Sequence, residues 1–257
     1  MRPVSTAIAV RDDPRVPRPV LVRRCPICGW RGLRFARVPG IARDRPLCPR
    51  CGSQQRHRHL WLWLVRETTL LGGRPLDVLH FAPEAGVERR LRRASPPLRY
   101  TTADSEPAAG TDLVLDLQHL DLASGSVDVV LCSRVLEHVA DDAAALRELR
   151  RVLRPGGWGV LQTPVQGLAT VEEQPGDDPA LRLERFGQAD HVRIYGRDYL
   201  ERLRAAGFAA EALLYRDEIT ALDRRRFGLL YDLRAEFGLD FNALDEPWEI
   251  WRVEVPC

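Results

Sequence analysis

The chain has 257 residues, of which 45% are hydrophobic and 29% are charged, and its formal net charge is +2. This composition excludes an intrinsically disordered chain, and the length suits one ordinary α/β domain with a small appendage. No apolar run reaches the roughly 18 residues of a membrane span, and the first ten residues do not form a signal peptide. We therefore expect a cytoplasmic protein with no part in the membrane.

The charge is unevenly distributed along the chain. Residues 1–60 carry 14 arginines against three aspartates, so the remainder is acidic. A basic front on an acidic body is typical of a protein that binds RNA or another anionic partner. Every basic residue is an arginine, however, which also fits a coding bias of the source genome. A nucleic-acid partner is therefore the less favoured alternative.

The chain divides into three parts. Residues 1–22 mix proline and arginine without apolar periodicity and are expected to form a flexible arm. Residues 23–55 are a compact module defined by its cysteines, and residues 56–257 form the main domain. A helix over 56–71 opens this domain, and Gly72-Gly73 end it.

From Pro75 onward, short apolar runs alternate with helical patterns, which is typical of a parallel sheet with crossover helices. Glu84 is expected to cap a helix, Pro155-Gly156-Gly157 predicts a turn before a strand, and Arg224-Arg225-Arg226 opens an extra helix. A long polar insertion occupies 165–190. We expect strands over 76–81, 98–104, 112–116, 127–133, 158–164, 208–216 and 248–255, and helices over 84–93, 141–153 and 197–206.

The four cysteines of the small module stand in two copies of one C-P-x-C-G motif. Each such turn directs two thiolates at one point, and two turns complete a tetrahedral four-sulfur site, for which structural zinc is the favoured ion. Iron in a rubredoxin-like site and disulfides are the alternatives. Because four protein ligands leave no open position, the metal should hold the module together and take no part in chemistry. The ligands are Cys25, Cys28, Cys48 and Cys51.

A pattern of sequence segments follows the small module. The segments are LDVLHFAPEAG (76–86), YTTADS (100–105), LVLDLQHL (113–120), SVDVVLCSRVLEHV (126–139) and LRPGGWGVL (153–161). Their order and spacing resemble the class I S-adenosylmethionine-dependent methyltransferases, with a methyltransferase type 11-like pattern. The resemblance implies a Rossmann-like, doubly wound, seven-stranded α/β sheet with an antiparallel last strand, preceded here by an N-terminal zinc ribbon.

The resemblance also implies S-adenosylmethionine as cofactor, bound beyond the carboxyl ends of the strands. Asp104 ends a strand and is placed to accept both ribose hydroxyls. Asp116 fits the adenine pocket, although it could equally cap a turn. The loop over 80–86 keeps one glycine where the family has several, so the methionine part must be contacted differently. The implied cofactor-binding residues are His80, Phe81, Ala82, Pro83, Glu84, Asp104, Ser105, Asp116, Leu117, Ser133 and Arg134.

Two histidines are candidates for the base that removes a proton from an acceptor hydroxyl. His191, beside Asp190 at the end of the long insertion, is the favoured candidate. His138, about five residues after the fourth strand, is the second. Either side chain could instead have a purely structural role.

The sequence predicts a methyltransferase that acts on a small molecule or a glycan, by O-methylation. The strings CPRCGSQQRHR and RFGQADHVRIYG are similar to those of bacterial methyltransferases that look like tailoring enzymes for sugars or secondary metabolites. One alternative is an RNA methyltransferase that holds nucleic acid with its basic zinc ribbon, although the N/D-P-P-Y-type string of amino-methylating enzymes is absent. The other is a non-catalytic cofactor-binding scaffold.

Overall fold

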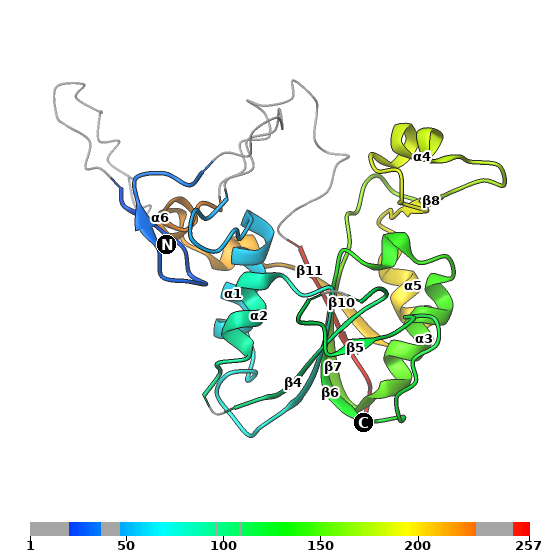
Figure 1. The fold of residues 1–257 in the computed structure, drawn as a ribbon, viewed down its shortest axis with the longest axis horizontal. Coiled ribbons are helices and arrows are strands. Elements are labelled where there is room, and N and C mark those ends of the chain that lie inside the picture. Colours follow the sequence, from blue (N-terminus) through cyan, green and yellow to red (C-terminus); the bar gives the residue numbers. More distant parts are fainter. Residues whose placement is uncertain (1–20, 37–46, 96, 108, 230–248) are drawn as a thin grey trace, which may run out of the picture.

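A computed structural model of the chain describes residues 21–36, 47–95, 97–107, 109–229 and 249–257. Nearly all of the predicted arm over 1–22 lies outside these residues. One seven-stranded sheet forms the centre of the molecule (Figure 1). In spatial order its strands are β10 (Ala209–Leu214), β11 (Glu249–Glu254), β7 (Leu153–Gln162), β6 (Val127–Ser133), β3 (Asp77–Phe81), β4 (Arg99–Asp104) and β5 (Leu113–Val114).

The strand order contains one topological switch. The chain passes from β3 outward to β4 and β5, and then returns to the other side of β3 to form β6 and β7. These five strands are parallel, whereas β11 runs antiparallel to both β7 and β10. The predicted doubly wound sheet with an antiparallel last strand is confirmed. Its switch point, between β3 and β6, is where open α/β sheets bind ligands.

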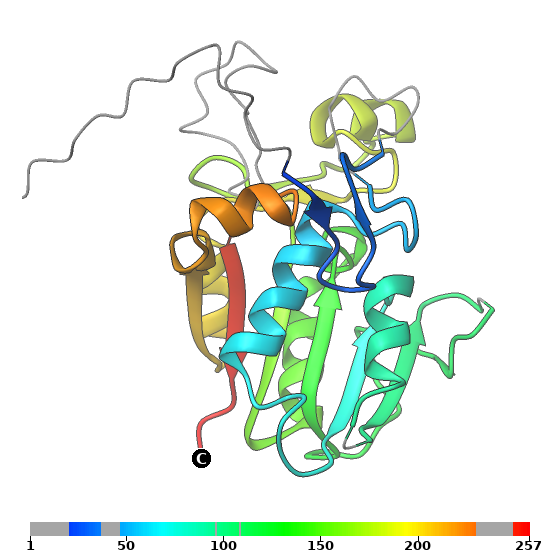
Figure 2. The same ribbon diagram turned by 90° about the vertical axis from the view of Figure 1, so that its left-hand side faces the viewer.

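Helices cover both faces of the sheet. Figures 1 and 2 show α1 (Gln55–Glu67) and α2 (Ala85–Leu91) on one face, with α3 (Asp142–Val152) and α5 (Tyr199–Ala205) on the other. Successive strand residues point to opposite faces, so Val78 and Val129 pack with α1 while Leu79 and Val130 pack in the second core. Because both faces are covered, the central strands are largely apolar and buried, as in β6, where all seven residues are buried and only Asp128 and Ser133 are polar.

The remaining elements are short and lie around this central unit. They are β1 (Arg23–Arg24) and β2 (Arg31–Gly32), the 3-10 turns η1 (Leu136–His138) and η2 (Tyr215–Glu218), β8 (Val171–Glu172), α4 (Pro179–Phe186), β9 (Arg193–Ile194) and α6 (Ala221–Arg226). Three of them, β8, α4 and β9, belong to the long insertion and its return. Within the described residues, no helix is long and apolar enough to cross a bilayer.

The cysteine module shares its core with the main domain. Cys25 and Cys48 are 0% and 1% exposed and belong to the same buried cluster as Leu60 and Trp61 of α1. Arg58, also on α1 and 0% exposed, donates to the carbonyl oxygens of Phe227 (2.8 Å) and Gly228 (2.9 Å). The Arg58 guanidinium thus holds the segment after α6 against α1, next to the cysteine module.

Several predicted element boundaries are wrong, and two of the differences have a clear cause. The first helix ends at Glu67 instead of continuing to residue 71, because the Thr68 hydroxyl donates to the Leu64 carbonyl (2.6 Å) and accepts from the Leu70 amide (3.2 Å). The three arginines 224–226 close α6 rather than open it, since the helix starts after Thr220, whose hydroxyl accepts from the backbone of residue 223. Their position suits the negative end of the helix dipole.

The turn predicted at 155–157 occurs inside a strand. The strand β7 begins at Leu153, which pairs with Val127, and its pairing with Val129 resumes only at Trp158. The intervening residues bulge out, with Gly156 in the left-handed region at φ 72°. Turn and strand are therefore combined in one irregular element, and the preceding helix ends one residue earlier than predicted.

Candidate active site and metal centre

Two residues with left-handed backbone flank the switch point. Ala82 (φ 45°) directly follows β3, and Arg134 (φ 62°) directly follows β6; among the described residues they alone adopt positive φ without being glycine. Such conformations cost of order 1 kcal/mol or more, and they concentrate at functional sites. Backbone contacts hold both, since the Ala82 amide donates to Ala103 (2.9 Å) and the Arg134 amide to Gln162 (2.8 Å).

The loop after β3 is organised by a carboxylate between imidazoles. Glu84 stands at the N-terminal boundary of α2, but its side chain does not cap the helix as predicted. It turns toward His80, at 3.4 Å, and toward His57 of α1, at 3.8 Å. Burial raises the pKa of the Glu84 carboxyl, but the interactions with His80 and His57 together outweigh it and lower the pKa to about 2. Fully buried His80 also contacts the Tyr100 hydroxyl (2.7 Å).

Asp104 lies at the carboxyl end of β4, next to this loop in the sheet. Its Oδ1 atom accepts from the Ser105 amide at 2.8 Å. This bond orients the carboxylate and leaves Oδ2 as the oxygen that can accept from a ligand. Asp116 is exposed, and its Oδ1 accepts from the Gln118 amide at 2.9 Å, which is the turn-capping arrangement. Leu117 beside it is buried at 4% exposure.

The other predicted cofactor residues differ in exposure. Phe81 is 2% exposed and packs in the core beneath α3, so only its backbone lies at the loop. Ala82 and Pro83 are half-buried, and Ser133 is 9% exposed at the end of β6. The backbone of these residues, rather than their side chains, is what the edge of the sheet presents between β3 and β6.

The two predicted catalytic histidines lie together. Their rings contact edge to face, with centroids 4.7 Å apart, although the residues are more than 50 positions apart in sequence. Buried Glu137 joins them, and single ligand atoms of Glu137, His138 and His191 all lie within 4.8 Å of one another. Burial lowers the pKa of His191, with the charge of His138 acting in the same direction. His191 is therefore a neutral imidazole at neutral pH, able to accept a proton or a metal ion.

The long insertion holds this cluster in place. The Val192 amide donates to the Glu137 carbonyl at 3.0 Å. Arg193, 3% exposed, donates to the carbonyls of Leu136 (2.9 Å) and Ala140 (2.8 Å), so one guanidinium fixes both ends of the η1 turn. The Glu172 carboxylate pairs with Arg193 at 2.8 Å from the opposite side. His191 is thus positioned by the backbone and side-chain bonds of the two residues that follow it.

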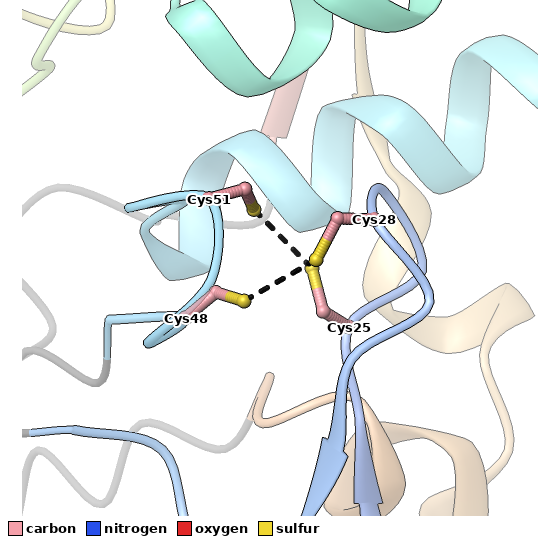
Figure 3. Close-up of side chains that lie close together, drawn as sticks. All are labelled: Cys25, Cys28, Cys48 and Cys51. Atoms are coloured by element: carbon pink, nitrogen blue, oxygen red, sulfur yellow. Dashed lines mark hydrogen bonds between the residues drawn. The ribbon is translucent and has the colours of Figure 1, made fainter.

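The four cysteines form the second cluster at this edge of the sheet. Figure 3 shows Cys25 and Cys28 on one loop facing Cys48 and Cys51 on the other. The sulfur atoms of Cys25 and Cys51 lie 3.7 Å apart, and those of Cys28 and Cys48 lie 3.5 Å apart. A tetrahedral zinc ion with bonds of about 2.3 Å separates its sulfur ligands by about 3.8 Å, so the cluster fits zinc.

The cysteine cluster contacts the helix that follows the first loop. A Cβ atom on Gly86, in the first turn of α2, would lie 3.5 Å from the Cys51 sulfur. His57, on the α1 helix that follows the module, approaches Glu84 at 3.8 Å, so the loop is contacted both by the module and by α1. The geometry of the loop over 82–86 therefore depends on the module beside it.

The sequence did not reveal several of the residues that build these sites. The sequence does not indicate Glu137 as a site residue, because its position next to His138 does not show whether its side chain is buried. Thr163, which donates to Glu137 at 3.1 Å, and Arg193 carry no motif of their own. Only the string DHVRIYG gives an indication in the sequence. It places Arg193 two residues after His191, where the long insertion ends.

Comparison with known proteins agrees with this architecture. Residues 91–161 match the methyltransferase domain family, a segment that runs from the end of α2 into β7. An uncharacterised transposon protein of Streptomyces fradiae is 38% identical over 106 residues, covering 38% of this chain and 29% of that protein. A "probable S-adenosylmethionine-dependent methyltransferase" of Mycolicibacterium smegmatis is 31% identical over 138 residues, covering 52% and 48%. The chain thus spans less than half the length of these relatives.

A third relative and one solved structure complete the comparison. The ubiquinone biosynthesis O-methyltransferase of Thiobacillus denitrificans is 29% identical over 122 residues, covering 46% of this chain and 49% of that protein. The crystal structure of the cyclase SpnF has the same fold, with a TM-score of 0.51 at 19% identity over 88% of both chains. Residues 91–161 thus match a methyltransferase domain, and they lie within the sheet whose strand order and fold are described above.

Proposed function

We propose that the chain is an O-methyltransferase that transfers the methyl group of S-adenosylmethionine to a hydroxyl of a small molecule or glycan, with a structural zinc ion in its cysteine module. One observation carries this proposal. The residues proposed to bind the cofactor and those proposed to act on the acceptor lie on opposite sides of the switch point. Asp104 and the loop over 82–86 lie on the β4 side, and the cluster of Glu137, His138 and His191 lies on the β6 side.

The first side suits the cofactor. Asp104 offers a carboxylate oxygen at the end of β4 for the ribose hydroxyls, and the left-handed turn at Ala82 exposes backbone groups between β3 and α2. S-adenosylmethionine supplies an electrophilic methyl group on a sulfonium ion. The remaining task is to align the acceptor oxygen and remove its proton.

The second side suits a hydroxyl acceptor. The cluster holds two imidazoles and a carboxylate, all groups that can help an O–H bond to ionise. An amine acceptor would already be nucleophilic and would not need such a cluster. The O-methyltransferase among the relatives is in line with this choice of acceptor.

A panel of acceptors tests the proposed function directly. Purified protein should form S-adenosylhomocysteine from S-adenosylmethionine with at least one member of a panel of sugars, phenols and hydroxy acids, and the new methyl group should be found on oxygen. Cofactor binding without turnover on any acceptor, amines and RNA included, would favour the scaffold alternative instead.

Replacement of Asp104 tests the cofactor side. We expect Asp104→Ala to weaken binding of S-adenosylhomocysteine by about 1–3 kcal/mol, or roughly 5- to 150-fold, the scale for losing charge-assisted hydrogen bonds to a bound ligand. Calorimetry measures the affinity. Glu106→Ala, which removes an exposed carboxylate from the same loop, is the matched control. An equal affinity in folded Asp104→Ala protein would remove this residue from the site.

RNA is a second candidate acceptor, favoured by a groove between the cysteine module and α2. The groove has a volume of about 400 Å³ and its rim carries four arginines with exposed side chains. Arginine clusters of this kind bind phosphates. It lies beside Gly86, close to the first loop. The lining arginines are Arg50, Arg89, Arg90 and Arg93.

Replacement of two arginines in the groove tests RNA as the acceptor. If RNA is the acceptor, the double variant Arg89→Ala/Arg93→Ala should weaken binding of a structured RNA similarly for all sequences, and the slope of log affinity against log salt should fall by about one per lost phosphate contact. Fluorescence anisotropy at several salt concentrations measures both quantities. Arg147→Ala, an exposed arginine on α3 at the other face, should change neither.

A further inference from the structure

We propose that Glu137, His138 and His191 bind a divalent metal ion in a second metal site, distinct from the four-cysteine site. One ligand atom of each residue lies within 4.8 Å of the others. Bonds of about 2.0–2.2 Å to a common ion separate its ligand atoms by roughly 3–4.4 Å. The three side chains would therefore have to move only slightly toward one another to bind one ion.

Buried atoms without partners point into this site. Glu137 is 1% exposed and His191 is 3% exposed. Among the described residues, Oε1 of Glu137 and the ring nitrogens of His191 make no hydrogen bond of ordinary geometry, although the Phe186 backbone lies close enough to the His191 ring to act against the lowering of its pKa. A buried polar group without a partner costs about 1–3 kcal/mol, and one cation at the centre of the cluster would satisfy the carboxylate and an imidazole together.

The outer contacts of the cluster resemble those that orient metal ligands. The Thr163 hydroxyl donates to Oε2 of Glu137 at 3.1 Å, which leaves Oε1 as the inner oxygen. Nδ1 of His138 lies 3.2 Å from the Asp190 carboxylate, so Nε2 is the nitrogen that would bind. Metal-bound histidines generally donate their other N–H to a carboxylate or carbonyl in this way. A histidine acting alone as a base needs no such arrangement around a neighbouring glutamate.

The electrostatic surroundings allow a cation. Two carboxylates, Glu137 and Asp190, face the histidines, and the one positive charge that bears on both Glu137 and His191 is that of half-exposed Arg134. Burial raises the pKa of the Glu137 carboxyl, and a bound cation would instead hold it ionised.

The ligand set defines the class of metal. Imidazole nitrogens favour iron, nickel, copper or zinc over calcium and magnesium, which prefer oxygen ligands, and manganese binds such a mixed site more weakly than they do. Two histidines and one carboxylate on one side of an ion leave positions open on the other. An acceptor with two adjacent oxygens, such as a vicinal diol, a catechol or a 2-hydroxy acid, can fill them.

The role of the ion rests on the proposed function. Coordination lowers the pKa of the acceptor hydroxyl, whose proton passes to solvent. The oxygen then forms a bond to the methyl carbon while the carbon–sulfur bond breaks and its electron pair remains on sulfur. The products are the methyl ether and S-adenosylhomocysteine, so charge and atoms balance without a further reagent.

Metal binding can be tested without turnover. Protein loaded with one zinc ion per chain in its cysteine module is titrated with Mn²⁺, which competes poorly for thiolates. Electron paramagnetic resonance measures the free Mn²⁺. We expect one additional ion per chain, with affinity at least about 100-fold weaker in His191→Ala and in the nearly isosteric Glu137→Gln. His119→Ala, which removes an exposed histidine from another loop, should bind as the wild type does.

The outcomes separate this site from the proposed function. Absence of a second ion, with Mn²⁺ by resonance and with excess zinc by elemental analysis, overturns the site, as does unchanged binding in both variants. Methyl transfer to a hydroxyl by protein that holds only the module zinc would keep the function and overturn the site. A second ion without methyl transfer on any hydroxyl acceptor keeps the site and rejects the function. Affinity for S-adenosylhomocysteine reports whether each variant is folded.

Discussion

His191→Ala is expected to lower the turnover number by about 100-fold or more while leaving the affinity for S-adenosylhomocysteine nearly unchanged. Acid–base or metal-assisted ionisation of an acceptor hydroxyl contributes about 10²–10⁴ in rate, and His191 lies in the cluster proposed to provide it. Its contact with His138 is on the acceptor side of the switch point, away from Asp104. Steady-state kinetics and calorimetry measure the two quantities on the same preparation.

His138→Ala should act in the same direction. Its imidazole is 31% exposed and pairs with Asp190, so it is the more accessible member of the pair. His119→Ala serves as the control, because this exposed histidine stands on the loop after β5 and outside the cluster. Near-normal turnover in both cluster variants would exclude histidine chemistry from the reaction and would point to an acceptor that is nucleophilic without help.

The sequence predicts a strand most accurately where that strand is buried on both faces of the sheet. The strand expected at 127–133 occurs with the same boundaries, because a strand of a parallel sheet that is buried on both faces is recognisable as a short, mostly apolar run. The strand expected at 112–116 shrinks to Leu113–Val114. Its first residue, Asp112, instead bonds the backbone and hydroxyl of Thr102 at 2.8 and 2.9 Å, a long-range contact that no local pattern reveals.

The candidate sites were predictable to the extent that they are local in sequence. The two C-P-x-C-G motifs predict a four-cysteine cluster from the sequence alone, and the four sulfur atoms lie together as the motifs predict. The contact of His138 with His191 depends on where a long insertion returns to the sheet, which is set by Val192 and Arg193 bonding to the η1 turn. Both histidines were identified as candidates, but their common partner Glu137 was not, because its burial is a property of the tertiary structure.

The cysteine module packs into the core of the main domain and is not a separate appendage. Cys25 and Cys48 pack in one cluster with Val87 and Leu91, the buried residues of α2, and Cys51 contacts the position of Gly86. The loop over 82–86 and the start of α2 therefore pack against the module. Binding of structural zinc releases about 10–16 kcal/mol in small peptides, comparable with the whole stability of an ordinary domain.

Loss of the zinc ion is consequently expected to weaken cofactor binding as well as stability. The purified chain should contain about one zinc ion per four-cysteine site, and Cys48→Ser should lose it, melt at a lower temperature and bind S-adenosylhomocysteine at least about tenfold more weakly. Cys257→Ser, which changes an exposed cysteine outside the cluster, should match the wild type in all three measurements. A metal-free chain with unchanged melting temperature and cofactor affinity would show that the module neither binds structural zinc nor supports the loop over 82–86.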